Sequence, residues 1–459
     1  MVVASIDIQN GRVVQLKQGR ELVLQRDNAL ELVEEFDKYG EVAVIDLDAA
    51  MNRGNNLNIV KSLLRRAECR VGGGIRTVEQ AKELVSLGAK RIIVGSQAFR
   101  DPAKKGAGIA GGEFAVNTAF LEALARAIGR ERLIVAIDAA SGTVQRTADS
   151  GADTGGTNVR GTPGTACEIV VDGWKTPTGL PLTESARTAA AFAGGLLFTC
   201  VDREGTMTGM DLTPVRALRE AVPETRITAA GGVSSMEEIA ALACLDCDVQ
   251  LGMALYTGRI SLAEAFVESL NWNKCAGHSG GLISVIAQSS GGQVLMTGYA
   301  DREAVAETFK RGSLCFHSRT RNRLWMKGEN SGSLLQVKRL RADCDRDALL
   351  AEVDPVGPVC HTGDWSCFGV DRRYTWDYLQ AIIAGRFRSP TPGSYTATLD
   401  HALVREKIME EAEELCTAKT RDEVIWEAAD LLYFATALIT REGVSVEEIL
   451  DELDRRHKK

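Results

Sequence analysis

The residues best suited to chemistry lie in a segment that interleaves carboxylates with thiols. Its three alternating aspartates are Asp343, Asp345 and Asp347. Its three cysteines are Cys344, Cys360 and Cys367. Carboxylates suit magnesium and thiolates suit zinc, so the pattern predicts two different metals side by side. If the segment is extended, the aspartates lie on one side of it and Cys344 on the other. Three cysteine ligands leave one zinc position open for water, as in a catalytic zinc site.

Two other metal sites fit this segment less well. A calcium-binding EF-hand loop also has the D-x-D-x-D pattern, but Ala348 stands where that loop needs glycine. No helical pattern precedes the segment either. A purely structural zinc is the other alternative, and the count of three cysteines favours the catalytic kind.

A second group of carboxylates lies near the C-terminus. Glu411 and Glu414 are three residues apart, as are Glu427 and Asp430, which places each pair on one face of a helix. Four carboxylates converging from two antiparallel helices would repel each other unless a divalent cation lay between them. The pattern therefore predicts magnesium. The alternative is a solvated acidic face, although the apolar neighbours of Asp430 indicate partial burial.

Acid–base chemistry in the first 277 residues cannot use histidine, because the first of the five histidines is His278. Asp7 and Asp138 are the best candidates there. They occupy equivalent positions of an internal repeat, in which ASIDIQNGRVV aligns with VAIDAASGTV. At the ends of opposed strands they would form a general acid and base pair. The alternative is that each aspartate caps a following loop.

Glycine runs recur in the same repeat, in which VGGGIRTVEQAKELVSLGAKRIIVGSQAF aligns with AAGGVSSMEEIAALACLDCDVQLGMALY. Glycine lets backbone N–H groups approach an anion, and a following helix N-terminus favours negative charge. The predicted phosphate-binding residues are Gly73, Gly74, Arg76, Gly95 and Ser96 in the first half and Gly231, Gly232 and Gly252 in the second. The alternative is that these glycines merely end strands.

Eight apolar runs separated by helical patterns must position these residues. The runs are VVASID, VAVIDLD, CRVGGGI, RIIVGS, LIVAID, LLFTCVD, RITAAGG and VQLGMA. Buried parallel strands that alternate with amphipathic helices, such as 76–89 and 234–245, predict an α/β fold: a (β/α)8 barrel of the TIM type with roughly 250 residues. The Gly/Thr/Ala-rich stretch 143–167 predicts a long loop, and a similar Gly/Ala stretch spans 105–112.

The pattern changes after the barrel, and the 459 residues are enough for three domains. We expect the barrel in 1–272, a polar, glycine-rich linker in 273–281, a small α+β zinc domain in 282–369 and an all-α domain in 374–459. The zinc domain is strand-rich, with ISVIAQ, QVLMTGY, LCFHS and LLQVKRL. The last domain has apolar residues at helical spacing in 395–418 and 422–442.

Composition excludes several classes of protein. The formal charge of -8 offers no basic field for nucleic acid. No apolar run reaches the ~18–20 residues of a spanning helix, and the start has no signal-peptide pattern, so we expect a cytoplasmic protein and no membrane partner. Eleven cysteines without small-domain spacing argue against a disulfide scaffold. The lone pair Cys244 and Cys247 is best explained as small core residues.

Residues 1–272 resemble the HisA-like isomerase family of histidine biosynthesis. The matching stretches are SIDIQNGRVVQLKQG, VIDLDAA, VGGGIR, VGSQA, AIDAASG, DGW, GGVSS and GMALY. The resemblance implies that Asp7 is the general base and Asp138 the general acid of an Amadori rearrangement of ProFAR, an aminoaldose with two phosphates. It also implies that Thr199 and Trp174 line the substrate site. The family pattern T-D-I-x-x-D-G is changed here at Cys200 and Glu204.

Residues 282–369 resemble phosphoribosyl-AMP cyclohydrolase. The matching stretches are VLMTGYADREA, SRTRNRLWMKGENSG, ADCDRDALL and VCHTGDWSCF. The resemblance implies that a zinc-activated water opens the adenine ring, and that the zinc lies between two subunits of a homodimer. His361, next to a zinc ligand, is the candidate proton shuttle, with His317 as a second choice that could equally be a buried structural histidine. Candidates for phosphate and ribose contacts are Arg319, Arg321, Lys327 and Ser331.

The C-terminal part resembles phosphoribosyl-ATP pyrophosphohydrolase of the all-α, MazG-like class. The match rests on 394–396, on the K-I-x-E-E-A-x-E pattern from Lys407 to Glu414, and on E-x-A-D-L-L-Y from Glu427 to Tyr433. The resemblance implies a magnesium ion that bridges a pyrophosphate and activates water, with Glu411 and Glu414 as catalytic residues. Phe434 replaces the histidine usual in the family.

Together the three resemblances imply one multifunctional enzyme that acts on phosphoribosyl-ATP, phosphoribosyl-AMP and ProFAR in turn. The helical domain releases pyrophosphate, the zinc domain opens the adenine ring, and the barrel isomerises the product. One alternative makes the barrel a non-catalytic scaffold for the two hydrolases. Another, an unrelated zinc sensor, leaves the carboxylate helices unexplained.

Overall fold

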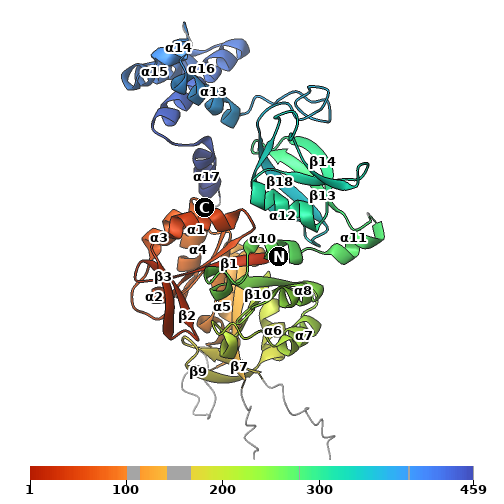
Figure 1. Cartoon of the computed structure of the whole chain (residues 1–459). Coiled ribbons are helices and arrows are strands. Elements are labelled where there is room, and N and C mark those ends of the chain that lie inside the picture. The colour runs from red at the N-terminus through yellow and green to blue at the C-terminus, as the bar shows by residue number, and fades with distance from the viewer. Residues whose placement is uncertain (101–113, 142–166, 279, 391–392, 458–459) are drawn as a thin grey trace, which may run out of the picture.

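The computed structural model describes residues 1–100, 114–141, 167–278, 280–390 and 393–457. In this part of the chain a closed barrel comes first, a sheet-based middle domain second and a helical domain last (Figure 1). The glycine-rich stretches predicted to form loops, 105–112 and 143–167, lie outside the described residues except for Cys167.

Eight parallel strands close the barrel, which confirms the predicted fold. In spatial order they are β1 (Val2–Gln9), β4 (Val42–Asp46), β5 (Cys69–Gly72), β6 (Arg91–Val94), β7 (Leu133–Ser141), β10 (Gly195–Cys200), β11 (Arg226–Ala230) and β12 (Cys247–Leu251). The ring is closed where β12 pairs with β1 and β10 pairs with β7. Each strand corresponds to one of the predicted apolar runs.

Helices cover the outside of the barrel (Figure 1). They are α1 (Ala29–Asp37), α2 (Leu47–Ala50), α3 (Leu57–Leu64), α4 (Val78–Ser86), α5 (Thr118–Ile128), α6 (Leu182–Ala190), α7 (Leu212–Ala221), α8 (Met236–Cys244), α9 (Met253–Tyr256) and α10 (Leu262–Glu268). Short 3-10 turns add η1 (Ser96–Phe99), η3 (Arg130–Arg132) and η4 (Val201–Arg203). The helices predicted over 76–89 and 234–245 are α4 and α8.

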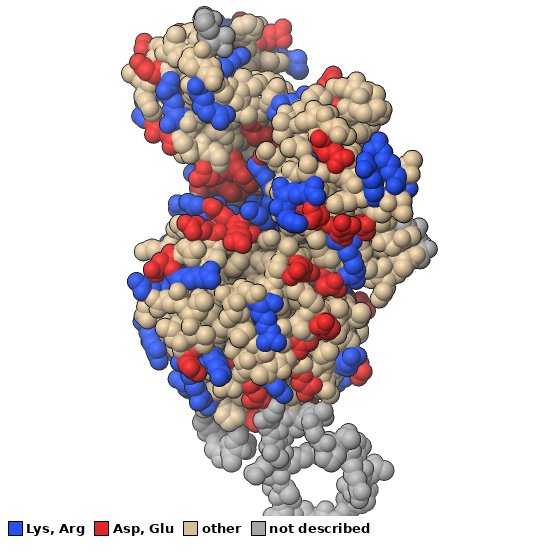
Figure 2. Space-filling view, viewed as in Figure 1, with Lys and Arg blue, Asp and Glu red and all other residues tan. Residues whose placement is uncertain are grey.

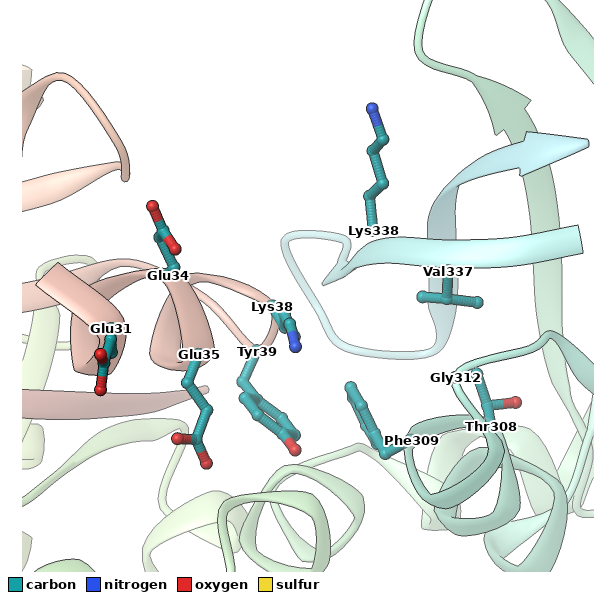
Figure 3. A pocket seen from close by; sticks show the side chains of 10 residues that line it. All are labelled: Glu31, Glu34, Glu35, Lys38, Tyr39, Thr308, Phe309, Gly312, Val337 and Lys338. Carbon is teal, nitrogen blue, oxygen red and sulfur yellow. The ribbon is translucent and has the colours of Figure 1, made fainter. Parts of the chain in front are cut away.

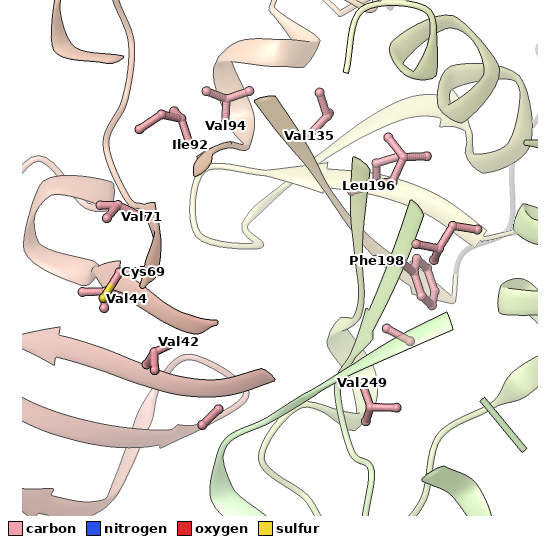
Figure 4. Packing of buried hydrophobic residues seen from close by; sticks show 14 of the residues in the cluster. Val42, Val44, Cys69, Val71, Ile92, Val94, Val135, Leu196, Phe198 and Val249 are labelled. Carbon is pink, nitrogen blue, oxygen red and sulfur yellow. The ribbon is translucent and has the colours of Figure 1, made fainter. Parts of the chain in front are cut away.

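The main core lies between the sheet and these helices. Its buried strand residues include Val42, Val44, Cys69, Val71, Ile92, Val94, Val135, Leu196, Phe198 and Val249 (Figure 4). Intervening strand residues form a separate cluster inside the barrel: Ile93, Ile134, Ala136, Leu197 and Ala230. Because side chains alternate along a strand, this pattern turns Asp7, Asp138 and Thr199 toward the barrel axis.

Two hairpins that sequence analysis did not predict extend the internal repeat. β2 (Arg12–Lys17) and β3 (Glu21–Arg26) follow β1, while β8 (Cys167–Val171) and β9 (Thr176–Pro181) follow β7. Both hairpins rise from the strand ends that carry Asp7 and Asp138. They therefore frame the mouth of the barrel, at the bottom of Figure 1.

The middle domain is built on a four-stranded sheet in the order β14 (Val294–Ala300), β13 (Ile283–Ser289), β18 (Ala348–Pro355), β17 (Leu335–Ala342). Helix α12 (Arg302–Arg311) and the hairpin of β15 (Cys315–Ser318) and β16 (Arg323–Met326) complete it. Most of the segment predicted as a linker is helical, since α11 spans Trp272–His278.

The last domain is helical, as predicted. Its helices are α13 (Trp376–Arg388), α14 (Tyr395–Thr398), α15 (His401–Thr417), α16 (Arg421–Arg441) and α17 (Val446–His457). The stretch 395–418, which has apolar residues at helical spacing, forms two helices. The second, α15, starts just after Asp400, whose side chain accepts a hydrogen bond from the Leu403 N–H. Helix α17 leads back to the barrel and contacts α4.

The base of the barrel faces the middle domain. Asp37, at the end of α1, pairs with Arg339 at 3.0 Å and Arg341 at 3.3 Å. The rings of Tyr39 and Phe309 stack across the same contact, with centroids 4.4 Å apart. They line a pocket of about 490 Å³ whose other walls include the α1 glutamates and Lys338 (Figure 3).

Acidic and basic side chains gather along this contact, whereas they are interspersed over the visible barrel wall (Figure 2). In the described residues, none of the helices combines the length and apolar character needed to cross a membrane.

Candidate active sites

Three carboxyl groups meet at the mouth of the barrel. Asp7 and Asp138 lie on inward-facing positions of β1 and β7. Glu204 follows η4, and its carboxyl group interacts electrostatically with both aspartates. The backbone N–H of Gln18 in the β2–β3 hairpin donates to the Glu204 carbonyl oxygen at 3.1 Å and holds this loop. The predicted pair is thus joined by a third acid.

The three acids have raised pKa values. Burial raises the pKa of Asp7 to about 6. A hydrogen bond of 2.9 Å from the Ser5 hydroxyl to Asp7 Oδ1 acts in the opposite direction and lowers the pKa. Burial also raises the pKa of Asp138. Burial, followed by the charges of Asp7 and Asp138, raises the pKa of Glu204 to about 8. At pH 7 Asp7 is mostly ionised and Glu204 mostly protonated, so the mouth holds both a proton acceptor and a proton donor.

Thr199 and Trp174 both contact Asp138, and their hydrogen bonds oppose the rise in its pKa. Thr199 is the register partner of Asp138 between β10 and β7. Trp174 lies in the β8–β9 turn with a positive φ of 67°. Its ring packs on Gly19 of the other hairpin, where an added Cβ would lie 3.0 Å from ring atom Cζ3. Thr199 and Trp174, the two predicted substrate-lining residues, therefore both lie beside the Asp138 carboxyl group.

The paired glycines after β5 and β11 have matching conformations. Gly73 and Gly231 have φ values of 102° and 100°. A Cβ would lie 2.2 Å from the Asp46 carbonyl oxygen at Gly73, and 2.5 Å from the Cys200 carbonyl oxygen at Gly231. Only glycine fits such positions. The following Gly74 and Gly232 also have positive φ, 68° and 86°.

The equivalence continues into the elements after these glycines. Helices α4 and α8 each start with a capping box, formed by Thr77 with Gln80 and by Ser235 with Glu238. Gly95 and Gly252 precede η1 and α9, with φ/ψ of -107°/-110° and -120°/-100°. The two halves therefore present the same backbone at both predicted phosphate loops.

Two other predicted phosphate ligands have protein partners. The Arg76 guanidinium donates to the carbonyl oxygens of Ala49, Ala50 and Gly74 at 2.9–3.1 Å. Ser96 Oγ accepts a hydrogen bond of 3.0 Å from the Asp172 N–H. Both side chains brace the loops that carry the glycines.

Gln15 is a polar residue of this site that sequence reasoning missed. It lies on β2, is 3% exposed, and its Nε2 has no hydrogen-bond partner among the described residues. A Cβ on Gly252 would lie 2.9 Å from Gln15 Oε1. A buried donor without a partner, next to a predicted phosphate loop, suits an anionic ligand. No sequence signal singles it out, because it simply alternates with apolar residues of the strand.

In the middle domain, Cys360 and Cys367 are hydrogen-bonded to each other. The Thr362 hydroxyl donates to Cys360 Sγ at 3.0 Å and lowers the pKa of that thiol, while burial raises the pKa of Cys367. Cys344 is exposed. Among the described residues the ligand atoms of the three cysteines do not all lie within 4.8 Å of one another. The structure therefore brings two of the three predicted zinc ligands together within one chain.

The predicted magnesium aspartates of this domain do come together: carboxylate oxygens of Asp343, Asp345 and Asp347 lie within 4.8 Å of one another. The segment is a turn between β17 and β18, so the expected extended conformation is wrong. Asp343 Oδ1 closes the turn by accepting hydrogen bonds from the N–H groups of Asp347 and Ala348. Lys274 of α11 pairs with Asp345, and with Asp347 at 2.8 Å.

Of three further candidates in the middle domain, Lys327 and His361 lie near the cysteine pair, whereas His317 is bound to other residues. Lys327 is buried, which lowers its pKa, and it lies near Cys360 and Cys367, whose charges oppose that shift. His361 contacts Cys360, with 3.8 Å between Nδ1 and Sγ. His317 has partners at both ring nitrogens, Asp301 Oδ2 at 2.6 Å and Asn322 Oδ1 at 3.2 Å. That arrangement favours its structural interpretation.

Three predicted phosphate or ribose contacts are exposed: Arg319, Arg321 and Ser331. The Arg319 guanidinium carbon lies 4.0 Å from the centroid of the Tyr299 ring. Ser331 Oγ accepts a hydrogen bond from the Ser333 N–H at 3.3 Å.

Helices α15 and α16 bring the C-terminal carboxylates together. Oxygens of Glu411, Glu414 and Glu427 lie within 4.8 Å of one another. Burial, then the charges of Asp430 and Glu414, raise the pKa of Glu411. Burial, then Glu414, raises the pKa of Glu427. All four predicted residues thus form one acidic cluster, a donor set that fits a divalent cation.

Comparison with known proteins finds a family model for each of three successive segments of the chain. Residues 1–261 match the family model "Histidine biosynthesis protein". Residues 296–369 match "Phosphoribosyl-AMP cyclohydrolase", and residues 377–457 match "Phosphoribosyl-ATP pyrophosphohydrolase".

Curated relatives match the part of the chain after the barrel. The histidine biosynthesis bifunctional protein HisIE of Pyrococcus furiosus is 39% identical over 210 residues, which are 42% of this chain and 99% of the relative. The HisIE protein of Escherichia coli strain K12 is 38% identical over 207 residues, 43% of this chain and 100% of the relative. The predicted resemblances are confirmed. The chain belongs to the histidine biosynthesis protein family, and it joins a ProFAR isomerase barrel to phosphoribosyl-AMP cyclohydrolase and phosphoribosyl-ATP pyrophosphohydrolase domains.

Proposed function

We propose that the barrel isomerises the aminoaldose ProFAR by proton transfer, with Asp7 as general base and Asp138 as general acid. The main support for this proposal is that two acids face into the barrel and meet at its mouth, between two equivalent glycine loops. Asp7, with a pKa of about 6, is ready at pH 7 to remove a proton from carbon. Asp138, with its raised pKa, donates to the ribose oxygen as the ring opens.

The two phosphates of the substrate fit the two-fold repeat. One binds the backbone amides at Gly73, Gly74 and Gly95, and the other binds those at Gly231, Gly232 and Gly252. Equivalent backbone conformations in the two halves support equivalent ligands. Thr199 and Trp174 orient Asp138, and Glu204 supplies a neutral hydrogen-bond donor between the two acids.

For the middle domain we propose a zinc site made by Cys344, Cys360 and Cys367. Cys344 is exposed and lies apart from the other two cysteines, so we propose that it completes the site with the cysteine pair of a second subunit in a homodimer. Asp343, Asp345 and Asp347 are the proposed magnesium ligands. Zinc, when bound, would supply the Lewis acidity that activates a water for opening the adenine ring of phosphoribosyl-AMP. His361 moves the proton, and Lys327, Arg319, Arg321 and Ser331 bind phosphate and ribose.

For the helical domain we propose that Glu411, Glu414, Glu427 and Asp430 hold magnesium. The carboxylates are close, and burial followed by the charges of neighbouring carboxylates raises the pKa values of Glu411 and Glu427, so a cation would stabilise the cluster. When bound there, magnesium would supply charge neutralisation for the pyrophosphate of phosphoribosyl-ATP. Glu411 and Glu414 orient the attacking water. We also propose a cytoplasmic location, because the zinc site requires reduced thiols.

Complementation of a strain that lacks only the isomerase tests the barrel most directly. The full chain should restore growth without histidine, and Asp7→Asn should fail to restore it. A wild-type chain that binds ProFAR without converting it would support the scaffold alternative. In that case the changes at Cys200 and Glu204 become the first explanation.

A further inference from the structure

The turn that carries Cys344 and the three aspartates is anchored on the barrel by Arg346. This side chain is 5% exposed. Its Nη1 donates to the Cys247 carbonyl oxygen at 3.3 Å. Its Nη2 donates to the Ala243 carbonyl oxygen at 3.1 Å and to Asp246 Oδ1 at 2.6 Å. The three acceptors span the α8–β12 connection at the barrel base: Ala243 is in the last turn of α8, Asp246 lies in the connection, and Cys247 begins β12.

These acceptors are well matched to a guanidinium group. Ala243 is in the last turn of α8, where carbonyl oxygens lack helical partners and the helix dipole favours a cation. A planar guanidinium can serve several acceptors at once, which a lysine ammonium cannot do with the same geometry. The contact is thus specific to an arginine at this position.

The segment just after the barrel holds the same turn from its backbone side. The Asn271 N–H donates to the Arg346 carbonyl oxygen at 2.8 Å, and Asn271 Nδ2 donates to the Asp345 carbonyl oxygen at 3.3 Å. Cys275 Sγ lies 3.8 Å from the Asp347 carbonyl oxygen. Three successive carbonyl groups of the turn are therefore bound by residues that connect the barrel to the middle domain.

Arg346 also has an unfavourable backbone conformation, which indicates that its contacts hold the turn in place. Its φ is 65°, in the left-handed region that favours glycine. The side-chain contacts to the barrel offset this strain. An arginine in this conformation, buried against another domain, is suited to fixing the shape of the turn.

We propose that the barrel base is a positioning support for the metal-binding turn of the cyclohydrolase, and that Arg346 is the positioning residue. The proposal rests on the proposed zinc role of Cys344. Groups that orient metal ligands typically change metal affinity by 10–100-fold when removed. The HisIE relatives are matched over nearly their whole length by the part of this chain after the barrel. The support is therefore a feature of the fused chain.

Arg346→Gly in the full-length protein tests the proposal, because glycine keeps a φ of 65° without strain while the anchor is lost. The measurement is the rate at which the zinc-loaded protein releases zinc to a chromophoric chelator. We expect release about tenfold faster than from wild type. Hydrogen exchange of backbone amides 343–347 in the zinc-free protein should also become faster, which reports on the turn without any metal.

Arg339→Ala is the matched control, because it removes another arginine contact with the barrel, at Asp37, outside the turn. It should release zinc at the wild-type rate. The isomerase activity of Arg346→Gly should stay at the wild-type level, because the barrel mouth is at the opposite end. Wild-type rates of zinc release and amide exchange in Arg346→Gly would overturn the proposal.

Two further variants keep the test decisive. If Arg346→Gly fails to fold, Arg346→Lys replaces it and should show faster release, and an unchanged rate would overturn the proposal. Cys344→Ser separates the anchor from the ligand assignment. If Cys344→Ser releases zinc like wild type, the proposed zinc site is wrong. If Cys344→Ser loses zinc and Arg346→Gly does not, only the anchor is wrong.

Discussion

Replacing Glu204 by glutamine should stabilise the barrel at neutral pH. The pKa of Glu204 rises from an ordinary value of 4.5 to about 8 on folding. Between these values the folded protein holds a proton that the unfolded chain releases, so stability falls as pH rises through this window. Each tenfold change in proton affinity corresponds to 1.36 kcal/mol. Between pH 4.5 and pH 7 the free energy of unfolding therefore falls by about 3 kcal/mol. Glu204→Gln should restore this stability.

Hydrogen exchange of peptides from β7 and β10 measures the free energy of opening of the barrel in the full chain, separately from the other domains. The gain in Glu204→Gln should be largest at pH 7 and above and should disappear below about pH 4.5. Glu220→Gln, on the exposed side of α7, should change nothing at any pH. A gain that does not depend on pH, or no gain, would refute the assignment of a buried, protonated carboxyl group.

The same variant should retain isomerase activity within about 100-fold of wild type, since groups that transfer protons typically contribute 10²–10⁴-fold. Asp7→Asn and Asp138→Asn should lose isomerisation by that larger factor while equilibrium binding of ProFAR stays close to wild type. In wild type, kcat/KM of the isomerase should rise with pH through about 6, as Asp7 ionises. Cys367→Ser should abolish ring opening and leave pyrophosphate release unchanged, as measured by separate product assays. Glu411→Gln should block pyrophosphate release, and magnesium should restore activity to metal-stripped wild type but not to this variant.

The parts of the barrel that repeat in the sequence were the most predictable. Gly73 and Gly231 occur at matching positions after strands, and their left-handed conformations leave no room for another residue. Alternation along the strands was enough to direct Asp7 and Asp138 inward. Local chemistry and periodicity determine these features, and both can be read from one sequence.

The features that sequence analysis missed depend on contacts between distant segments. Glu204 was singled out only as a change from the family pattern, and its place beside the two aspartates was not predicted. A hairpin after β1 holds its loop, and nothing near Glu204 in the sequence indicates that hairpin. The turn at Asp343 was expected to be extended because alternating residues suggest a strand. Hydrogen bonds to Asp343 Oδ1 close the turn, and Arg346, whose partners lie on another domain, anchors it.

The mouth and the base are opposite ends of the barrel, and this separation affects how an intermediate passes from the middle domain to the barrel site. The base contacts the middle domain, whereas the hairpins and the acids of the mouth lie at the far end (Figure 1). Within one chain, the product of ring opening must therefore diffuse around the barrel through bulk solvent before it can be isomerised. A labelled intermediate made by the middle domain should therefore mix with unlabelled intermediate added to the solution, which should lower the label in the isomerised product. We therefore predict that fusion fixes the three enzymes in equal amounts while their intermediates remain part of a shared pool.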